Sequence, residues 1–165
     1  MTLFNGPIEV GVRTLALLVA LHPRPLDLNE LVILDYLIVH SADLAGGPPS
    51  LHPASPLRSG EVSIRRTLIE DAVTLLKSRL LAREEFSAEG IRYSVGDYGT
   101  AFLDTLDSDH SRRIRARAKW IAERTNGRDP AVLLEEFAGS LEKWRQEFAT
   151  IVDVDVATEA DAWAS

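Results

Sequence analysis

The first apolar stretch has the spacing of an amphipathic helix. Its apolar positions advance by steps of four and three residues, which places them on one helical face: Ile8, Val12, Leu15 and Val19. Pro7 suits the first turn of a helix, and Pro23 and Pro25 stop a helix soon after the last apolar residue. We therefore expect a helix from about Pro7 to Leu21.

A second helix is predicted to begin after Asp27 and to run through His40. Glu30 follows Asp27 by three residues, which is the spacing of a capping box. The residues after Glu30 are apolar on nearly every side of the helix, so this helix should lie inside the fold rather than on its surface.

Asp35 interrupts this apolar helix with a carboxylate. A lone buried charge is too costly to persist, so Asp35 needs a partner. We expect an internal ion pair with Arg13, Arg58 or Arg65, which would also anchor the loop that follows the helix.

A loop rich in proline and glycine then leads to a third helix. Residues 41–58 contain too many breakers for a regular element. A helix is expected from Gly60 to about Leu80. Its predicted buried stripe consists of Val62, Ile69, Ala72, Val73, Leu76 and Leu80. Arg65 and Arg66 are expected off this stripe, on the exposed side.

Two short segments with alternating apolar residues come next. Residues 81–86 and 91–95 have the alternation of strands, and residues 87–90 between them are typical of a hairpin turn. Three helices followed by a hairpin is the element order of a winged helix.

The C-terminal part is predicted to be helical. Helices are expected over residues 97–106, 109–125 and 129–149. The fold class is therefore mainly α. We expect a winged-helix-like domain over residues 1–96, a helical extension packed on it over residues 97–150, and an acidic, poorly ordered tail over residues 151–165.

Charge and composition argue against several classes of function. The 165 residues hold 18 Lys and Arg against 25 Asp and Glu, so a net charge of −7 disfavours a free-standing DNA-binding protein. The chain has no cysteine, which excludes disulfides, thiolate metal sites and cysteine nucleophiles. No stretch reaches the roughly 20 apolar residues that span a bilayer, and the N-terminus does not resemble a signal peptide, so a cytoplasmic location is expected.

Positive charge nevertheless gathers at two places. Arg65 and Arg66 lie on the helix that would enter a major groove in a winged helix. The second cluster consists of Arg112, Arg113, Arg115, Arg117 and Lys119. Both clusters are candidates for DNA binding, and the alternative for each is an ordinary solvated face or pairing within the chain.

The loop after the second helix also holds residue types used in catalysis. Ser50 or Ser55 with His40 or His52 could be drawn as a hydrolase site, but no Gly-x-Ser-x-Gly motif supports it. The histidines and aspartates here match no known spacing of metal ligands. We therefore expect no catalytic residues, metal or cofactor.

Several segments together resemble one family. They are Phe4–Arg13, Leu34–Tyr36, Val39–Ser41, Asp43, Gly47–Pro48, Ser50–Pro53, Arg58–Glu61 and Arg65–Arg66. This combination resembles the middle component of bacterial ABC-three-component systems, second subtype, a group that overlaps the Lamassu anti-phage systems. The resemblance covers about residues 4–148.

The resemblance implies a non-catalytic subunit that works with an ABC or SMC-like coiled-coil ATPase and an effector, often a nuclease, against phages or plasmids. Its motif positions are expected to serve partner docking or loop architecture: Asp35, Tyr36, His40, Asp43, His52, Arg58 and Glu61, with Arg65 and Arg66.

Three functions follow from these observations. The leading one is an adaptor that docks on the ATPase and assists it in engaging DNA. The second is a dimeric winged-helix transcription regulator, against which the net charge argues. The third is a hydrolase or metal enzyme that uses the loop of residues 40–58.

Overall fold

The computed structural model describes residues 6–44, 46–52, 58–125 and 133, and for residues 58–63 the backbone alone. Its elements are α1 (Pro7–Leu21), α2 (Leu28–Val39), a short 3₁₀ helix η1 (Ser41–Asp43), α3 (Arg58–Ser78), β1 (Ala82–Ser87), β2 (Gly90–Val95), α4 (Gly99–Thr105) and α5 (Asp109–Thr125). The predicted mainly α fold, with three helices followed by a hairpin, is confirmed. No helix in these ranges is both long and apolar enough to cross a membrane.

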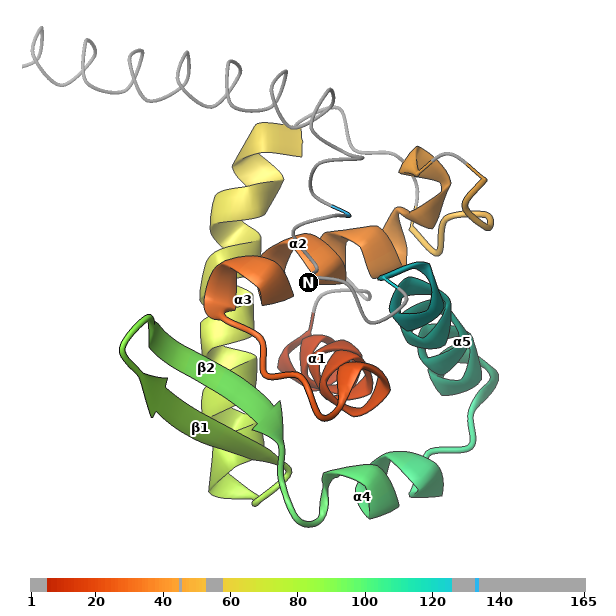
Figure 1. Cartoon of the computed structure of the whole chain (residues 1–165). Helices are drawn as coiled ribbons and strands as arrows, with labels where there is room; N and C mark the ends of the chain where they lie inside the picture. The colour runs from red at the N-terminus through yellow and green to blue at the C-terminus, as the bar shows by residue number, and fades with distance from the viewer. Residues whose placement is uncertain (1–5, 45, 53–57, 126–132, 134–165) are drawn as a thin grey trace, which may run out of the picture.

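Helix α1 occupies the centre of the structure. It packs against α2, α3, α4, α5 and β2, and Figure 1 shows it between α3 on one side and α5 on the other. Its predicted bounds are confirmed. Because α5 also contacts α2, the C-terminal helices pack on the first helices of the chain. The domain boundaries at residues 96 and 150 stay predictions.

Helix α2 begins as its sequence predicts. The backbone N–H of Glu30 donates to the carboxylate of Asp27 over 2.8 Å, and the backbone N–H of Asp27 donates to the carboxylate of Glu30 over 2.8 Å. Nine of its 12 residues are buried, including Asp35. The predicted capping box and the predicted burial of this helix are both confirmed.

The hairpin is attached to the helices through the segment before α2. Strands β1 and β2 pair antiparallel, with Ala82 opposite Val95 and Ser87 opposite Gly90. Leu26 exchanges two backbone hydrogen bonds of 2.8 Å with Tyr93 of β2. The hairpin therefore extends from the core rather than standing apart from it.

The end of α3 differs from the prediction. Leu80 is not part of the buried stripe: it follows the helix, has a φ of 59° and is 60% exposed. The backbone N–H of Leu81 donates to the carbonyl of Leu76, which closes the helix with a tight turn. Leu81 is buried in its place.

The loop before α3 also contains more structure than expected. Residues 41–43 form η1, and α3 already begins at Arg58, so the expectation of no regular element over residues 41–58 is wrong at both ends. Gly47 is required here, because a Cβ atom would lie 1.9 Å from the carbonyl oxygen of Ser41. The helix expected over residues 129–149 and the tail over residues 151–165 lie outside the described residues, except for the buried, helical Leu133.

Candidate functional site

Asp35 lies at the centre of a buried charge cluster formed with Arg13 and Arg65. Arg13 of α1 donates from Nε to Asp35 Oδ1 over 2.7 Å and from Nη2 to Oδ2 over 3.2 Å. Arg65 of α3 donates from Nη1 to Oδ2, the oxygen that also accepts from Arg13 Nη2. All three side chains are at most 3% exposed. The predicted internal ion pair of Asp35 is confirmed for Arg13 and Arg65, and the side chain of Arg58 lies outside the description.

The expectation that Arg65 lies on the exposed side is wrong. Arg65 precedes Ile69 by four residues, so its spacing places it on the buried stripe of α3. It can be buried because Asp35 supplies the opposite charge. Arg66 is half exposed as expected, and it contacts Asn29 at 2.6 Å and Glu70 at 3.6 Å.

The charge cluster keeps Asp35 ionised. Burial alone raises the pKa of Asp35, but the nearby guanidinium groups of Arg13 and Arg65 outweigh it and lower the pKa below its ordinary value. Asp35 is therefore ionised near neutral pH, and its charge connects α2 to α1 and α3.

Aromatic side chains extend this cluster toward the loop. The guanidinium of Arg65 lies 5.6 Å from the ring centre of Tyr36, and the Tyr36 hydroxyl donates a hydrogen bond to the carboxylate of Asp43. The ring of His40 lies 4.5 Å from that of Tyr36, and the ring of His52 lies 6.3 Å from that of His40. Four positions of the family motif thus come together beside the charge cluster: Tyr36, His40, Asp43 and His52.

Backbone hydrogen bonds hold the loop in this position. The N–H groups of Leu51 and His52 both donate to the carbonyl of Val39, at 2.9 and 3.1 Å. The Ser41 hydroxyl donates to the carbonyl of Pro48 over 3.1 Å. The segment that carries His52 is therefore folded back on the end of α2.

Glu9 connects the charge cluster to the surface. One oxygen, Oε1, lies 3.5 Å from Arg13 Nη1, 3.7 Å from His52 Nε2 and 2.8 Å from His110 Nε2. Burial and the Arg13 charge lower the pKa of His52, and Glu9 opposes them only in part. The four-residue spacing of Glu9 and Arg13 was visible in the sequence, but the contact of Glu9 with His110 spans 101 residues and had no local signal.

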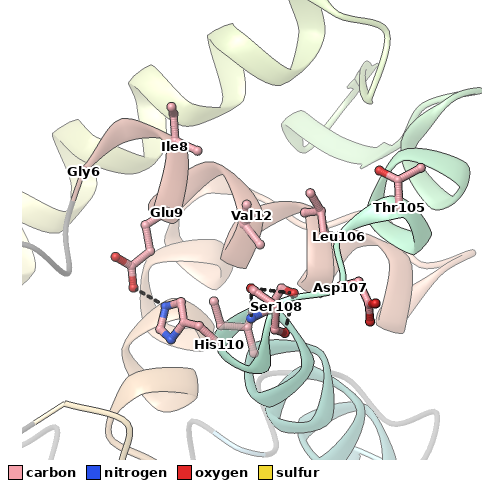
Figure 2. A pocket seen from close by; sticks show the side chains of 11 residues that line it. Gly6, Ile8, Glu9, Val12, Thr105, Leu106, Asp107, Ser108 and His110 are labelled. Atoms are coloured by element: carbon pink, nitrogen blue, oxygen red, sulfur yellow. Dashed lines mark hydrogen bonds and ion pairs between the residues drawn. The ribbon is translucent and has the colours of Figure 1, made fainter.

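A surface cavity of about 630 Å³ opens beside Glu9 and His110, between the start of α1 and the segment joining α4 to α5. Figure 2 shows Ile8, Val12 and Leu106 on its apolar side and the Glu9–His110 contact at its edge. Two serine hydroxyls of its lining are hydrogen-bonded within the chain. Ser108 Oγ accepts a hydrogen bond from the N–H of Ser111 and donates one to the Ser111 hydroxyl.

The residues considered for catalysis make structural contacts in the described part. Ser50 Oγ accepts a hydrogen bond of 3.2 Å from the N–H of Ala42, and Ser55 lies outside the description. Among the residues that the structure describes, no group of three or more metal-ligating side chains gathers. Here His40 and His52 are packed in the interior.

The basic residues of α5 mostly bind partners within the chain. Arg112 pairs with Asp107 and Asp109, Arg115 with Asp104 and Lys119 with Glu123, while Arg117 donates to the carbonyl of Pro49. Arg113 is exposed and has no ion pair within the described ranges. Four of these five side chains therefore have partners within the chain, which is the alternative to DNA binding that the sequence analysis names.

The motif positions named for docking are mostly interior. Asp35, Tyr36, His40 and His52 are buried, and Asp43 is partly exposed. The side chains of Arg58 and Glu61 are not described. These four motif side chains therefore lie inside the fold rather than on its surface.

The comparison with known families covers most of the chain. A model of the family described as ABC-three component (ABC-3C) system Middle Component 2 matches residues 3–147. No curated protein and no solved structure matches the chain. Residues 3–147 include every described helix and strand and all three members of the charge cluster, Arg13, Asp35 and Arg65.

Proposed function

Because the chain belongs to the family of ABC-three-component system Middle Component 2, it is an accessory subunit of such a system, and we propose that it acts as a non-catalytic adaptor that docks on the system's ABC-type ATPase. The family match over residues 3–147 is the observation that carries this proposal. The proposed partners are the ATPase, with SMC-like coiled coils, and an effector subunit, often a nuclease.

The interior position of the motif supports an adaptor. A buried ion pair contributes little net stability compared with apolar packing, but it penalises every arrangement in which its members lose each other. The cluster of Arg13, Asp35 and Arg65 thus favours one relative position of α1, α2 and α3. A subunit that must present a preformed surface to its partners benefits from such a constraint.

We place the complex in the cytoplasm, in defence against phages or plasmids, as the resemblance to the Lamassu systems implies. A plasmid-transformation or phage-plating assay with and without this subunit checks the proposed setting.

We further propose that DNA contact is weak in the isolated subunit. Arg66 and Arg113 are exposed, whereas Arg65 is buried and the other basic residues of α5 have partners. A net charge of −7 repels the duplex, so the dissociation constant at physiological salt should be no tighter than about 10⁻⁴ to 10⁻⁶ M.

A fluorescence-anisotropy salt titration tests this. Replacement of Arg66 and Arg113 by alanine should lower the salt slope by about one unit for each lost phosphate contact. Arg83→Ala, on the exposed face of β1, is the matched control. Nanomolar, sequence-selective binding by the isolated subunit would favour the transcription regulator instead.

Co-expression with the ATPase tests the adaptor directly. We expect the two subunits to elute together in gel filtration at micromolar concentration. For variants of this subunit, each tenfold loss of affinity for the ATPase corresponds to a loss of about 1.4 kcal/mol of binding free energy. Two separate peaks would contradict the proposed function.

A further inference from the structure

A second depression adjoins the cavity described above. It is an apolar groove of about 780 Å³ between α1, the end of α3 and α4, and it shares Ile8, Val12, Thr105 and Leu106 with the first cavity. Four large apolar side chains at this groove are exposed: Ile8 (77%), Leu75 (38%), Tyr98 (60%) and Phe102 (43%). Exposed apolar side chains that converge on one groove indicate a binding surface, whereas scattered ones do not.

Gly11 forms part of the floor of this groove. It lies in the middle of α1, where glycine costs about 1 kcal/mol relative to alanine. A Cβ atom built at Gly11 would meet no heavy atom within 4 Å, so no contact within the described subunit requires glycine at this position. Gly11 is itself buried, so a side chain added there would take up space in the groove rather than displace another part of the described subunit.

Arg79 is the one charged residue among the described residues that line the groove. Its side chain is exposed and forms no ion pair in the described part of the chain. The lining contains no carboxylate, so a second copy bound face to face through the same patch would bring none to Arg79. The charge therefore favours a different partner, one that carries an acidic side chain.

We propose that this groove binds an amphipathic helix of the ATPase subunit. The helix lays apolar side chains over Gly11, between Ile8 and Phe102, and places a carboxylate beside Arg79. A groove of this volume, bordered by three helices, holds several side chains of one helical face, which is how helix-in-groove complexes are formed. This inference rests on the proposed adaptor function and specifies its surface.

The test measures the affinity of the purified ATPase subunit for variants of this chain by calorimetry. Phe102→Ser, Arg79→Glu and Gly11→Leu should each weaken binding by about tenfold or more, as expected for central residues of an interface. Phe86→Ser on the hairpin, where Phe86 is 78% exposed, is the matched control and should bind like the wild type.

Gly11→Ala separates binding from folding. Alanine is the better helix former and fits the open space, so this variant should melt at a higher temperature than the wild type while binding the ATPase more weakly. A merely structural role of Gly11 cannot give higher stability together with lower affinity.

The possible failures are distinguishable. If the wild type binds the ATPase and the three groove variants bind equally well, the groove is not the docking site although the adaptor function stands. If the wild type does not bind the ATPase, both proposals are wrong. If Phe102→Ser changes the oligomeric state of the isolated chain, or deletion of residues 151–165 lets an added apolar probe enter the groove, the occupant is a second copy or the chain's own end, and the inference is overturned.

Discussion

Two arginine–carboxylate pairs in this molecule have the same N···O distance and opposite surroundings. Arg13 and Asp35 meet at 2.7 Å with side chains 1% and 0% exposed. Arg115 and Asp104 also meet at 2.7 Å, but their side chains are 32% and 63% exposed. The first pair joins α1 to α2 inside the fold, and the second joins α5 to α4 at its surface.

The comparison shows that solvent, not distance, decides what such a pair does. At the surface, water screens the charges and can replace either partner, so the pair contributes about 0 to 1 kcal/mol. Inside, no water replaces a lost partner, and removal of one member leaves the other charge buried. The interior cluster therefore favours one arrangement of α1, α2 and α3, whereas loss of an exposed charge on α5 should leave the fold unchanged.

The largest expected effect is that of Asp35→Ala. It leaves Arg13 and Arg65 as buried cations without their shared carboxylate, so the free energy of unfolding should fall by about 3 to 5 kcal/mol. Denaturant unfolding followed by circular dichroism measures the change. Asp104→Ala, at the exposed pair, is the control and should lower stability by at most about 1 kcal/mol. Equal melting of Asp35→Ala and the wild type would show that the cluster does not constrain the fold.

Arg65 and Arg66 provide a sharper test, because they are neighbours in α3 with opposite surroundings. Arg65→Met keeps an unbranched apolar stem in place of the aliphatic part of Arg65 but leaves Asp35 with Arg13 alone, which should cost about 1 to 3 kcal/mol. Arg66→Met removes only exposed contacts and should stay within about 0.5 kcal/mol of the wild type. If both substitutions had the same effect, burial would not be the deciding variable.

Local signals in the sequence were sufficient for most of the fold. The capping box of Asp27 and Glu30 and the prolines around α1 involve neighbours in sequence, and both helices begin where these residues predict. Leu80 was assigned wrongly because its place depends on how the chain turns into the hairpin after Leu76. Such a turn is set by packing between elements, which helical periodicity does not contain.

The site was only partly predictable for the same reason. Because Asp35 lies in an apolar helix, it needs a positively charged partner. The expected partners included Arg13 and Arg65, which are the two arginines that bind it in the structure. A charged residue type by itself favours an exposed position for Arg65, whereas its four-residue distance from Ile69 places it on the buried face of α3. The contact of His110 with Glu9 depends on how α5 packs along α1, and neither residue's neighbours indicate it.

A smaller effect concerns the pH dependence of stability through His52. Its pKa in the folded protein lies below the ordinary value of 6.5, because burial and the Arg13 charge oppose protonation. The unfolded chain then binds the proton more readily, so the stability that neutral His52 contributes is complete above pH 6.5 and is lost as the pH falls below it. The slope that one proton adds is at most about 1.4 kcal/mol per pH unit.

His52→Gln should reduce the dependence of the free energy of unfolding on pH below about pH 6.5. Unfolding free energies of the wild type and the variant between pH 8 and pH 5 give the difference directly, and the two curves should converge as the pH falls. Curves that stay parallel over this range would show that His52 titrates alike in the folded and unfolded chain.

The smallest effect is expected at the exposed pair of Arg115 and Asp104. A double-mutant cycle of Arg115→Ala and Asp104→Ala should give a coupling energy of about 0.2 to 1 kcal/mol at low salt. At 1 M salt the Debye length is about 3 Å, comparable to the N···O distance, so the coupling should become too small to measure. The buried pair of Arg13 and Asp35 is shielded from these ions and should keep its coupling at the same salt concentration. Equal loss of coupling at both pairs would mean that water and ions reach the interior cluster, and the contrast between the two regions would no longer hold.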